Sequence, residues 1–263
     1  MKNLLSILVI SVILFSCLTE VKRYSIEDTI SKNQLVYLEN DMSLLSGVVY
    51  RKNIDNQLIE EINYIDGKRD GEHKQWYENG QLKYEYNYKD GKEDGLFTTW
   101  YENGQKSSEY GYKNDNFVGY NKDWYENGQL KYEVFYKEGK EDGLERTWYE
   151  NRMLQEQFSY KEGKIDGLCS WWYDHGQIQF QWNYKDNLQE GLSKGWYKNG
   201  VLGYIGNFKE GKKDGISKEW YKNGQLMSER FYKNGKIDGL YKKWYENGQL
   251  EFITRYRDGE EIN

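Results

Sequence analysis

Apolar and polar residues alternate along most of the chain, and turn-forming residues interrupt the alternation at regular intervals. The segment LKYEYNYK (82–89) places Leu and three Tyr on one side and Lys, Glu and Asn on the other. The segments LKYEVFYK (130–137) and IQFQWNYK (178–185) repeat the same order. A period of two with many aromatic residues is typical of half-buried β-strands, so each segment is predicted to form one.

This pattern recurs every 24 residues without an insertion or deletion. A Trp-Tyr pair starts at positions 76, 100, 124, 148, 172, 196, 220 and 244. Glycines keep the same stride from Gly95 to Gly239, and a degenerate unit with Lys52 in place of tryptophan precedes the regular ones. A fixed stride of this kind predicts a repeat array in which neighbouring units cover one another.

Residues 34–263 are therefore expected to form one all-β array. The predicted fold is an elongated meander of tandem antiparallel β-hairpins in an open sheet, with a degenerate first unit and eight regular units from about residue 70. The chain has no proline and no alanine, which favours strands over helices. About eighteen strands are expected. The segments QLVYL (34–38) and SGVVY (46–50) are predicted to form the leading strand pair.

The turns carry their own sequence signal. Asn-Gly pairs such as Asn79-Gly80 join the two strands of six units, and they predict type I′ turns with positive φ at both residues. Asn151-Arg152 departs from this pattern, and because Arg152 would be strained at positive φ, a different turn is expected there. His175-Gly176 is expected to keep a structural role. A second turn at Asp90-Gly91 leads into the next unit.

The tryptophan series has two interpretations. The first is packing, with Leu96, Thr98 and Trp100 on one face of the first strand and the stems of lysines and arginines between the apolar side chains. The second is a row of exposed platforms for sugar rings or for side chains of a partner. The candidate partner-binding residues are Trp100, Trp124, Trp148, Trp172, Trp196 and Trp220.

The first residues resemble a bacterial lipoprotein signal. An apolar run from Leu4 to Phe15 follows one lysine and is too short to span a membrane, which is typical of a secretory signal. The order Leu-Phe-Ser-Cys before and at Cys17 resembles a lipobox. This resemblance implies a signal peptide over 1–16, a lipid on Cys17 and a membrane-anchored tether over 17–33. The alternative is an ordinary cleaved signal with an incidental cysteine.

The expected location is the bacterial cell envelope. Leu18 follows Cys17 where an aspartate would retain a lipoprotein at the inner membrane, so the outer membrane is favoured over the inner one in a cell with two membranes. With Cys17 modified, Cys169 is the only other cysteine, which excludes an internal disulfide. Cys169 shares its repeat position with Ser193 and Ser217, which argues against a reactive role.

Catalytic signatures are missing from the sequence. His73 and His175 have no second ligand at zinc spacing, so no metal site is predicted. No nucleophile elbow, phosphate-binding loop, dinucleotide fingerprint or kinase element occurs, so neither catalytic residues nor a cofactor are expected. The repeated carboxylates Glu85, Glu109, Glu133 and Glu229 are interpreted as a solvated face.

The distribution of charge argues against one class of partner. The chain has 37 basic and 43 acidic residues, a net charge of −6, and the two signs are interspersed. Nucleic-acid-binding proteins concentrate basic residues on one surface, so nucleic acid is not an expected partner. A modest acidic balance favours solubility.

The repeat itself resembles a known family. The unit YKDGKEDGLFTTWYENGQ (88–105) recurs as YKEGKEDGLERTWYEN (136–151) and FYKNGKIDGLYKKWYENGQL (231–250). It is similar to the bacterial MORN-repeat variant, arrays of which define the YwqK-type antitoxin family. The resemblance implies an elongated sheet that binds a protein partner, with a toxin as the example. A phosphatidylinositol phosphate kinase name would be transferred from MORN repeats alone, because this chain has no kinase domain.

The expected function is therefore that of a non-enzymatic, lipid-anchored envelope protein whose repeat sheet binds another protein, as an antitoxin or immunity protein would. The alternative is a module that binds glycans or the cell wall. A long sheet studded with side chains suits either role, since it offers an extended surface without an enclosed reaction centre.

Overall fold

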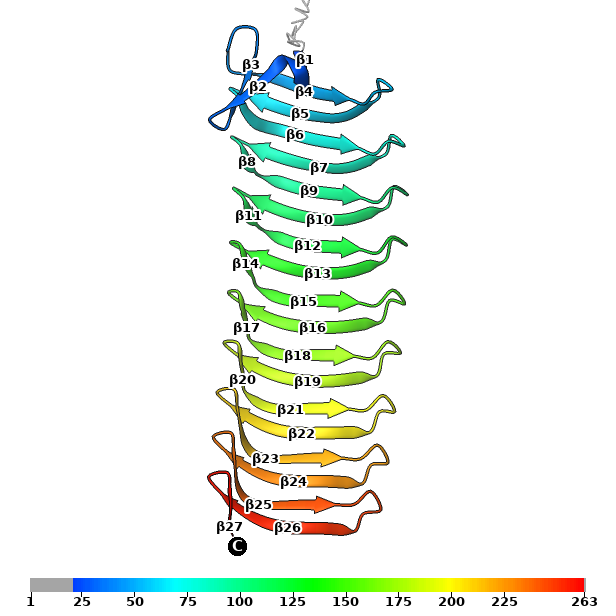
Figure 1. Ribbon diagram of the computed structural model, residues 1–263, viewed down its shortest axis with the longest axis vertical. Coiled ribbons are helices and arrows are strands. Elements are labelled where there is room, and N and C mark those ends of the chain that lie inside the picture. The colour runs from blue at the N-terminus through cyan, green and yellow to red at the C-terminus, as the bar shows by residue number, and fades with distance from the viewer. Residues whose placement is uncertain (1–20, 263) are drawn as a thin grey trace, which may run out of the picture.

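One continuous sheet runs the length of the molecule (Figure 1). The computed structural model describes residues 21–262, so Cys17 and the predicted signal peptide lie outside the described residues. Hairpins stack in chain order with their strands across the long axis, and within residues 21–262 the sheet contains 25 strands. The predicted all-β meander of tandem hairpins is confirmed. No helix in this range is long and apolar enough to cross a membrane.

Each unit contributes two long antiparallel strands. In residues 21–262 eighteen strands have six or more residues, which agrees with the expected number. The first strands are β4 Gly47–Lys52, β6 Lys68–Trp76, β9 Gly95–Trp100, β12 Gly119–Trp124, β15 Gly143–Trp148, β18 Gly167–Trp172, β21 Gly191–Trp196, β23 Lys212–Trp220 and β25 Lys236–Trp244. The second strands are β5 Leu58–Ile65, β7 Leu82–Lys89, β10 Lys106–Lys113, β13 Leu130–Lys137, β16 Leu154–Lys161, β19 Ile178–Lys185, β22 Leu202–Lys209, β24 Leu226–Lys233 and β26 Leu250–Arg257.

Short strands connect one unit to the next along the long edge of the sheet opposite the Asn-Gly turns (Figure 1). They are β8 Lys92–Glu93, β11 Asn116–Phe117, β14 Lys140–Glu141, β17 Lys164–Ile165 and β20 Leu188–Gln189, and β27 Glu260–Ile262 pairs with β26 after the last hairpin. Between β8 and β9 the chain bends at Gly95, which has a φ of +126°. A Cβ there would lie 2.9 Å from that of Asn87, so this glycine is required by geometry.

The Asn-Gly turns differ from the prediction. Gly80 has a φ of +82°, but Asn79 is not among the positive-φ residues, and the Gly80 N–H donates to the Tyr77 carbonyl over 2.9 Å. The loop therefore has three residues, a type I turn followed by a left-handed glycine. The Asn79 side chain stabilises it by accepting the Gln81 N–H at 2.9 Å. Type I′ geometry occurs instead at the second turn, where Asp90 and Gly91 have φ values of +50° and +83°.

The turn at Arg152 also differs from the prediction. It keeps the common form, because the Arg152 N–H donates to the Tyr149 carbonyl at 2.9 Å and Arg152 adopts a φ of +70°. The hairpin β15–β16 has eight long strands of the sheet on either side, and this context fixes the turn geometry more strongly than the preference of one residue opposes it.

Arg152→Gly is therefore expected to stabilise the protein by about 1 kcal/mol, because glycine adopts positive φ without the steric cost that arginine incurs. Urea unfolding followed by tryptophan fluorescence measures the change. Glu150→Gly, a substitution in the same turn outside the left-handed position, is the control and should not stabilise. A loss of stability in Arg152→Gly would contradict the assigned turn geometry.

The N-terminal segment closes one end of the sheet. It comprises β1 Arg23–Ser25, the 3-10 turn η1 Ile26–Asp28, β2 Thr29–Lys32 and β3 Leu35–Leu38. The predicted pairing of 34–38 with 46–50 is wrong: β3 pairs with β2, whereas β4 pairs with β5 and, in parallel, with β1. The two-residue turn between β2 and β3 favours a local hairpin, which folds over the end of the array.

The main buried cluster lies beneath this hairpin. Leu45, Val49, Ile62 and Tyr64 are at most 9% exposed, and partly buried side chains of β3 and η1 pack against them. The hairpin is anchored by backbone hydrogen bonds from Val36 to Gly67 at 2.9 Å and from Leu45 to Val36 at 3.0 Å. The first unit therefore has a conventional core, whereas later units depend on the sheet and its side-chain rows.

Candidate functional site

The two faces of the sheet differ in chemistry. One face, here the aromatic face, carries Tyr84, Tyr86 and Tyr88 of β7 and the side chains paired with them in neighbouring strands. The other, here the charged face, carries Glu85 and its counterparts. This separation was predicted from the alternation of residues 82–89, and it leaves both faces as long surfaces.

Rings on the aromatic face contact one another from unit to unit. Tyr86 stacks on Phe97 with centroids 4.0 Å apart, and Phe97 lies 5.7 Å from Tyr110. Phe117 then links the series to Tyr136 at 4.9 Å. These contacts bury much of each ring without covering it completely, so the face is both a packing layer and an accessible surface.

A row of varied residues runs through the middle of this face. Strand pairing places one residue of each unit in it, namely His73, Phe97, Asn121, Glu145, Cys169, Ser193, Ser217 and Tyr241. Cys169 is fully buried and shares the row with Ser193 and Ser217, as predicted. Burial raises the pKa of the Cys169 thiol, which disfavours the reactive thiolate.

The tryptophans lie at the end of each first strand, where the strand register shifts. Trp100 pairs with Lys106, whereas the adjacent Thr99 pairs with Ser108. The extra residue of this bulge, Ser107, lies in β10, so β9 keeps its alternation and Leu96, Thr98 and Trp100 share a face as predicted. The candidate partner-binding tryptophans are all half-buried, and they are Trp100, Trp124, Trp148, Trp172, Trp196 and Trp220.

Tyrosine hydroxyls connect the units along this edge. The tyrosine that follows each tryptophan donates to the carbonyl of the tryptophan in the next unit, from Tyr77 to Tyr221, over 2.6–3.0 Å. Asn79 adds a second contact by donating to the Glu102 carbonyl at 3.0 Å. His175 replaces this asparagine and donates through Nε2 to the Lys198 carbonyl at 3.1 Å, which confirms its structural role.

The charged face carries rows of opposite charge. Arg146 pairs with Glu133 at 2.8 Å, and Glu229 lies between Lys218 at 2.9 Å and Lys242 at 3.4 Å. The hydrogen bond from Lys218 lowers the pKa of Glu229 below its ordinary value. Repeated ion pairs of this kind hold charge in a regular pattern and give no carboxylate the distinct environment that acid–base catalysis needs.

Beside the ion pairs runs a row of exposed apolar side chains, here the apolar stripe. Its members follow the glycine at the start of each first strand, and pairing such as Leu96 with Gly111 places them on the charged face. The exposed fractions are 53% for Leu96, 55% for Tyr120, 39% for Leu168, 36% for Leu192, 49% for Ile216 and 41% for Leu240. Leu144, at the same position between Tyr120 and Leu168, is half-buried, so the exposed members form two runs, 96–120 and 168–240. Together they offer a candidate docking surface on side chains that were expected to pack.

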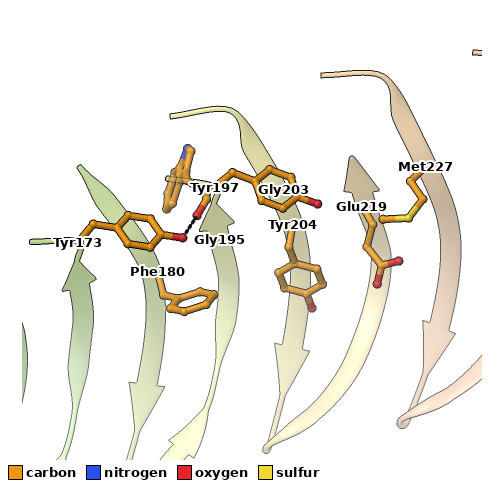
Figure 2. Close-up of a pocket in the computed structure, with 9 residues that line it drawn as sticks. Tyr173, Phe180, Gly195, Tyr197, Gly203, Tyr204, Glu219 and Met227 are labelled. Atoms are coloured by element: carbon orange, nitrogen blue, oxygen red, sulfur yellow. Dashed lines mark hydrogen bonds between the residues drawn. The ribbon is translucent and has the colours of Figure 1, made fainter. Parts of the chain in front are cut away.

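A cleft interrupts the aromatic face at Gly195 (Figure 2). Gly195 occupies the row just before the tryptophans, here the pre-tryptophan row, whose other members are Gln75, Thr99, Asp123, Thr147, Trp171, Glu219 and Lys243. The cleft has a volume of about 370 Å³ and is lined by Tyr173, Phe180, Gly195, Trp196, Tyr197, Gly203, Tyr204, Glu219 and Met227. The hollow beside Gly195 is thus bordered by five aromatic residues.

A charged cluster lies near the start of the array. Glu60 accepts a hydrogen bond from His73 Nε2 at 3.0 Å and contacts Arg51 at 2.8 Å. Glu60 and His73 are only 9% and 6% exposed. The hydrogen bond from His73 and the charge of Arg51 together lower the pKa of Glu60 against the opposing effect of burial. Within residues 21–262 no group of three or more metal-binding side chains gathers here or elsewhere.

Comparison with known proteins centres on the repeat. A family model described as MORN repeat variant matches residues 69–90, 93–114, 117–138, 165–186, 213–234 and 237–258, together about half of the chain. The matched segments leave out 139–164 and 187–212, although the strands there keep the same pairing. The segment 187–212 includes Gly195 and its cleft.

No curated protein matches the chain. One similar solved structure is "Crystal Structure of TcdB2-TccC3-Cdc42", with 10% sequence identity and a TM-score of 0.20. The match covers 85% of this chain and 14% of that chain, so this protein spans a small part of it. At that TM-score the likeness carries no argument about fold or function.

Proposed function

Because the chain belongs to the MORN repeat variant family, we propose that it is a non-enzymatic binding protein of the bacterial envelope, anchored by a lipid on Cys17, whose repeat sheet binds another protein. A repeat sheet of this kind is suited to binding, since it presents the same side-chain rows over many units. The resemblance to YwqK-type antitoxins makes a protein toxin the first partner to test.

The apolar stripe is the observation that carries this proposal. Its side chains are exposed at Leu96 and Tyr120 and again from Leu168 to Leu240, and members in neighbouring units lie about 10 Å apart because each unit contributes two strands. Exposed apolar patches that are flanked by charged residues often mark protein-binding sites, because leaving apolar surface in water is unfavourable. The adjoining ion pairs supply a polar rim of both signs.

The absence of catalysis is part of the same proposal. Its support is that the carboxylates of the charged face recur in similar ion pairs, and that Cys169 is buried with a raised thiol pKa. A reaction centre needs groups whose environments differ enough to separate their roles. Hydrolysis or group transfer of any substrate by the purified protein would contradict it.

The stripe is tested by a double substitution, Leu96→Ser with Tyr120→Ser. The full-length protein, solubilised in detergent and immobilised, is used to capture partners from the envelope fraction, and the bound partner is titrated to saturation. The variant is expected to bind at least about tenfold more weakly, because two adjacent apolar contacts are removed.

Ile65→Ser with Leu188→Ser is the matched control. These two residues are equally exposed, at 53% and 50%, but lie outside the stripe. The control should bind as the unmodified protein does, and circular dichroism should be the same for all three. Equal loss in both double variants, or saturable binding that the stripe variant retains, would refute the assignment of the stripe.

The anchor is tested separately. Cys17→Ser removes the thiol that the lipid would modify, so the protein is expected to leave the membrane fraction and appear in the soluble fraction after cell breakage. Metabolic labelling with a fatty acid should mark the unmodified protein and not the variant. Unchanged membrane association and unchanged labelling would contradict lipidation at Cys17.

A glycan- or wall-binding module remains the alternative, favoured by the accessible rings of the aromatic face. Stacking of sugars on such rings would retain the protein on purified cell wall in a pelleting assay. Retention that free sugar competes away, without a saturable protein partner, would favour this alternative over the protein-binding role.

A further inference from the structure

We propose that the cleft over Gly195 receives an aromatic side chain, an indole above all, presented by the protein partner. This inference rests on the proposed protein-binding function and adds the chemistry of one anchor residue to it. The cleft is distinct from the apolar stripe, since it opens on the aromatic face. It therefore predicts a second point of contact, at the edge of the sheet that carries the tryptophans.

The array provides an internal template for the occupant. One unit earlier, the pre-tryptophan row holds Trp171, whose ring lies edge-on to Phe158 with centroids 5.1 Å apart. Trp171 also lies 6.4 Å from Phe180, again edge-on. The same row position thus accommodates an indole between aromatic side chains of the neighbouring strands, in an arrangement that favours aromatic pairs.

The place beside Gly195 is also flanked by aromatic side chains, but it has no indole of its own. Gly195 pairs with Phe180 on one side and with Tyr204 on the other, so an inserted ring would lie between those two side chains. Figure 2 shows both rings beside the glycine, with Tyr173 and Tyr197 above them. Tyr173 is held in place by the hydrogen bond from its hydroxyl to the Trp196 carbonyl at 3.0 Å.

The glycine is not needed by the backbone. Gly195 has no positive φ, and its Cβ would lie 3.0 Å from the ring of Phe180 and 3.7 Å from the Gln179 carbonyl oxygen, so a side chain fits once that ring turns aside. Other units carry threonine, aspartate or tryptophan at this position. The unit also lies in a segment that the family model does not match, so the opening is a departure of this chain from its repeat.

The charges around the cleft select against a cationic group. Lys213 and Lys222 already lie against the rings of Tyr204 and Tyr197, with Nζ atoms 5.3 and 6.0 Å from the centroids. A lysine or ammonium group would meet these like charges. Glu219, at one end of the cleft, accepts from Ser228 and Arg230, and its two oxygens keep lone pairs that an indole N–H can use.

A fluorinated N-acetyltryptophanamide, followed by fluorine NMR, tests the cleft directly on the full-length protein. The probe is expected to bind saturably, and Gly195→Thr is expected to weaken it at least tenfold by filling the hollow with a side chain that Thr99 and Thr147 show to be compatible with this row. Leu188→Ser, outside both surfaces, should bind the probe as the unmodified protein does. N-acetyllysinamide and N-acetylglucosamine are measured in parallel and should bind more weakly.

Probe affinity that Gly195→Thr leaves unchanged would overturn the inference, as would tighter binding of the lysine or sugar probe. A second arm compares partner capture by the unmodified protein and by Gly195→Thr. A partner captured equally by both would also overturn it. If the probe binds and Gly195→Thr removes it, but no partner saturates the unmodified protein, the cleft stands as an aromatic site and the protein-binding function falls.

Discussion

Replacing Gly111 by alanine is expected to lower the free energy of unfolding by about 3 kcal/mol, the upper end of what overpacking costs. A Cβ on Gly111 would lie 2.3 Å from the carbonyl oxygen of Val118, so two backbones would have to separate. They are held together by the hydrogen bond from the Val118 N–H to the Gly111 carbonyl at 2.8 Å. A second bond, from the Gly111 N–H to the Asn121 side chain at 3.0 Å, fixes the same region.

Gly119→Ala is the matched control, because this glycine is needed for a different reason. Gly119 has a φ of +74° and open space where a Cβ would be, so alanine costs only the backbone penalty of about 1 kcal/mol. Urea unfolding of both variants, with tryptophan fluorescence and circular dichroism as probes, measures the difference. Equal losses would mean that the close approach at Gly111 relaxes without cost.

The second large effect is expected at Glu60. Glu60→Ala should destabilise the protein by about 2–3 kcal/mol, because it leaves the buried His73 and the nearby Arg51 without their shared acceptor. Glu61→Ala, which changes the adjacent carboxylate on the other face of the strand, is the control and should cost less. Similar losses of unfolding free energy in Glu60→Ala and Glu61→Ala would show that the buried Glu60–His73 hydrogen bond adds no stability of its own.

Glu60 also gives the stability a defined pH dependence. Its pKa is lower in the folded protein than the ordinary value of 4.5, mainly through the hydrogen bond from His73. Ionised Glu60 therefore stabilises the fold fully above pH 4.5, and this contribution disappears as the pH falls through the lower, folded pKa. The difference in unfolding free energy between the unmodified protein and Glu60→Gln should shrink steadily below pH 4.5. A constant difference down to pH 3 would contradict this linkage.

Much of the fold could be predicted because repetition makes weak local signals add up. The period-two alternation of 82–89 would be ambiguous alone, but its recurrence at a constant stride fixes both strand and turn in every unit. The errors arose where a side chain modifies the backbone. Asn79 stabilises a three-residue loop by accepting the Gln81 N–H, and this alternative to the type I′ turn is not visible in the Asn-Gly pair itself.

The face of the tryptophans was predicted correctly, because counting by two from Leu96 reaches Trp100 and the extra residue of the nearby bulge, Ser107, lies in the paired strand β10. The exposure of the apolar stripe was missed because alternation shows which residues share a face and not whether another layer covers it. The predicted pairing of 34–38 with 46–50 was wrong because a two-residue turn between β2 and β3 favours a local hairpin over pairing across a longer connection.

The cleft could have been found from the sequence, although the signal is a missing side chain. Aligning the units in columns shows Gly195 among residues that all carry side chains, directly after Trp171 in the same column. A glycine carries no reactive group, so it gives no chemical signal of its own in the sequence. Burial of the Glu60–His73 pair was beyond reach, because the two residues are 13 apart and become neighbours only through the register of β5 and β6.

The strands lie across the long axis, and successive units are joined by a backbone ladder and by a few side-chain contacts such as the tyrosine hydroxyl and asparagine amide hydrogen bonds. Tension applied between the two ends of the rod therefore loads those bonds one after another instead of all together. The protein should therefore unfold in steps, one unit of 24 residues at a time, and each step should lengthen the chain by on the order of 80 Å. A body tethered at one end and gripped at the other would thus extend in steps under load while its remaining units stay folded.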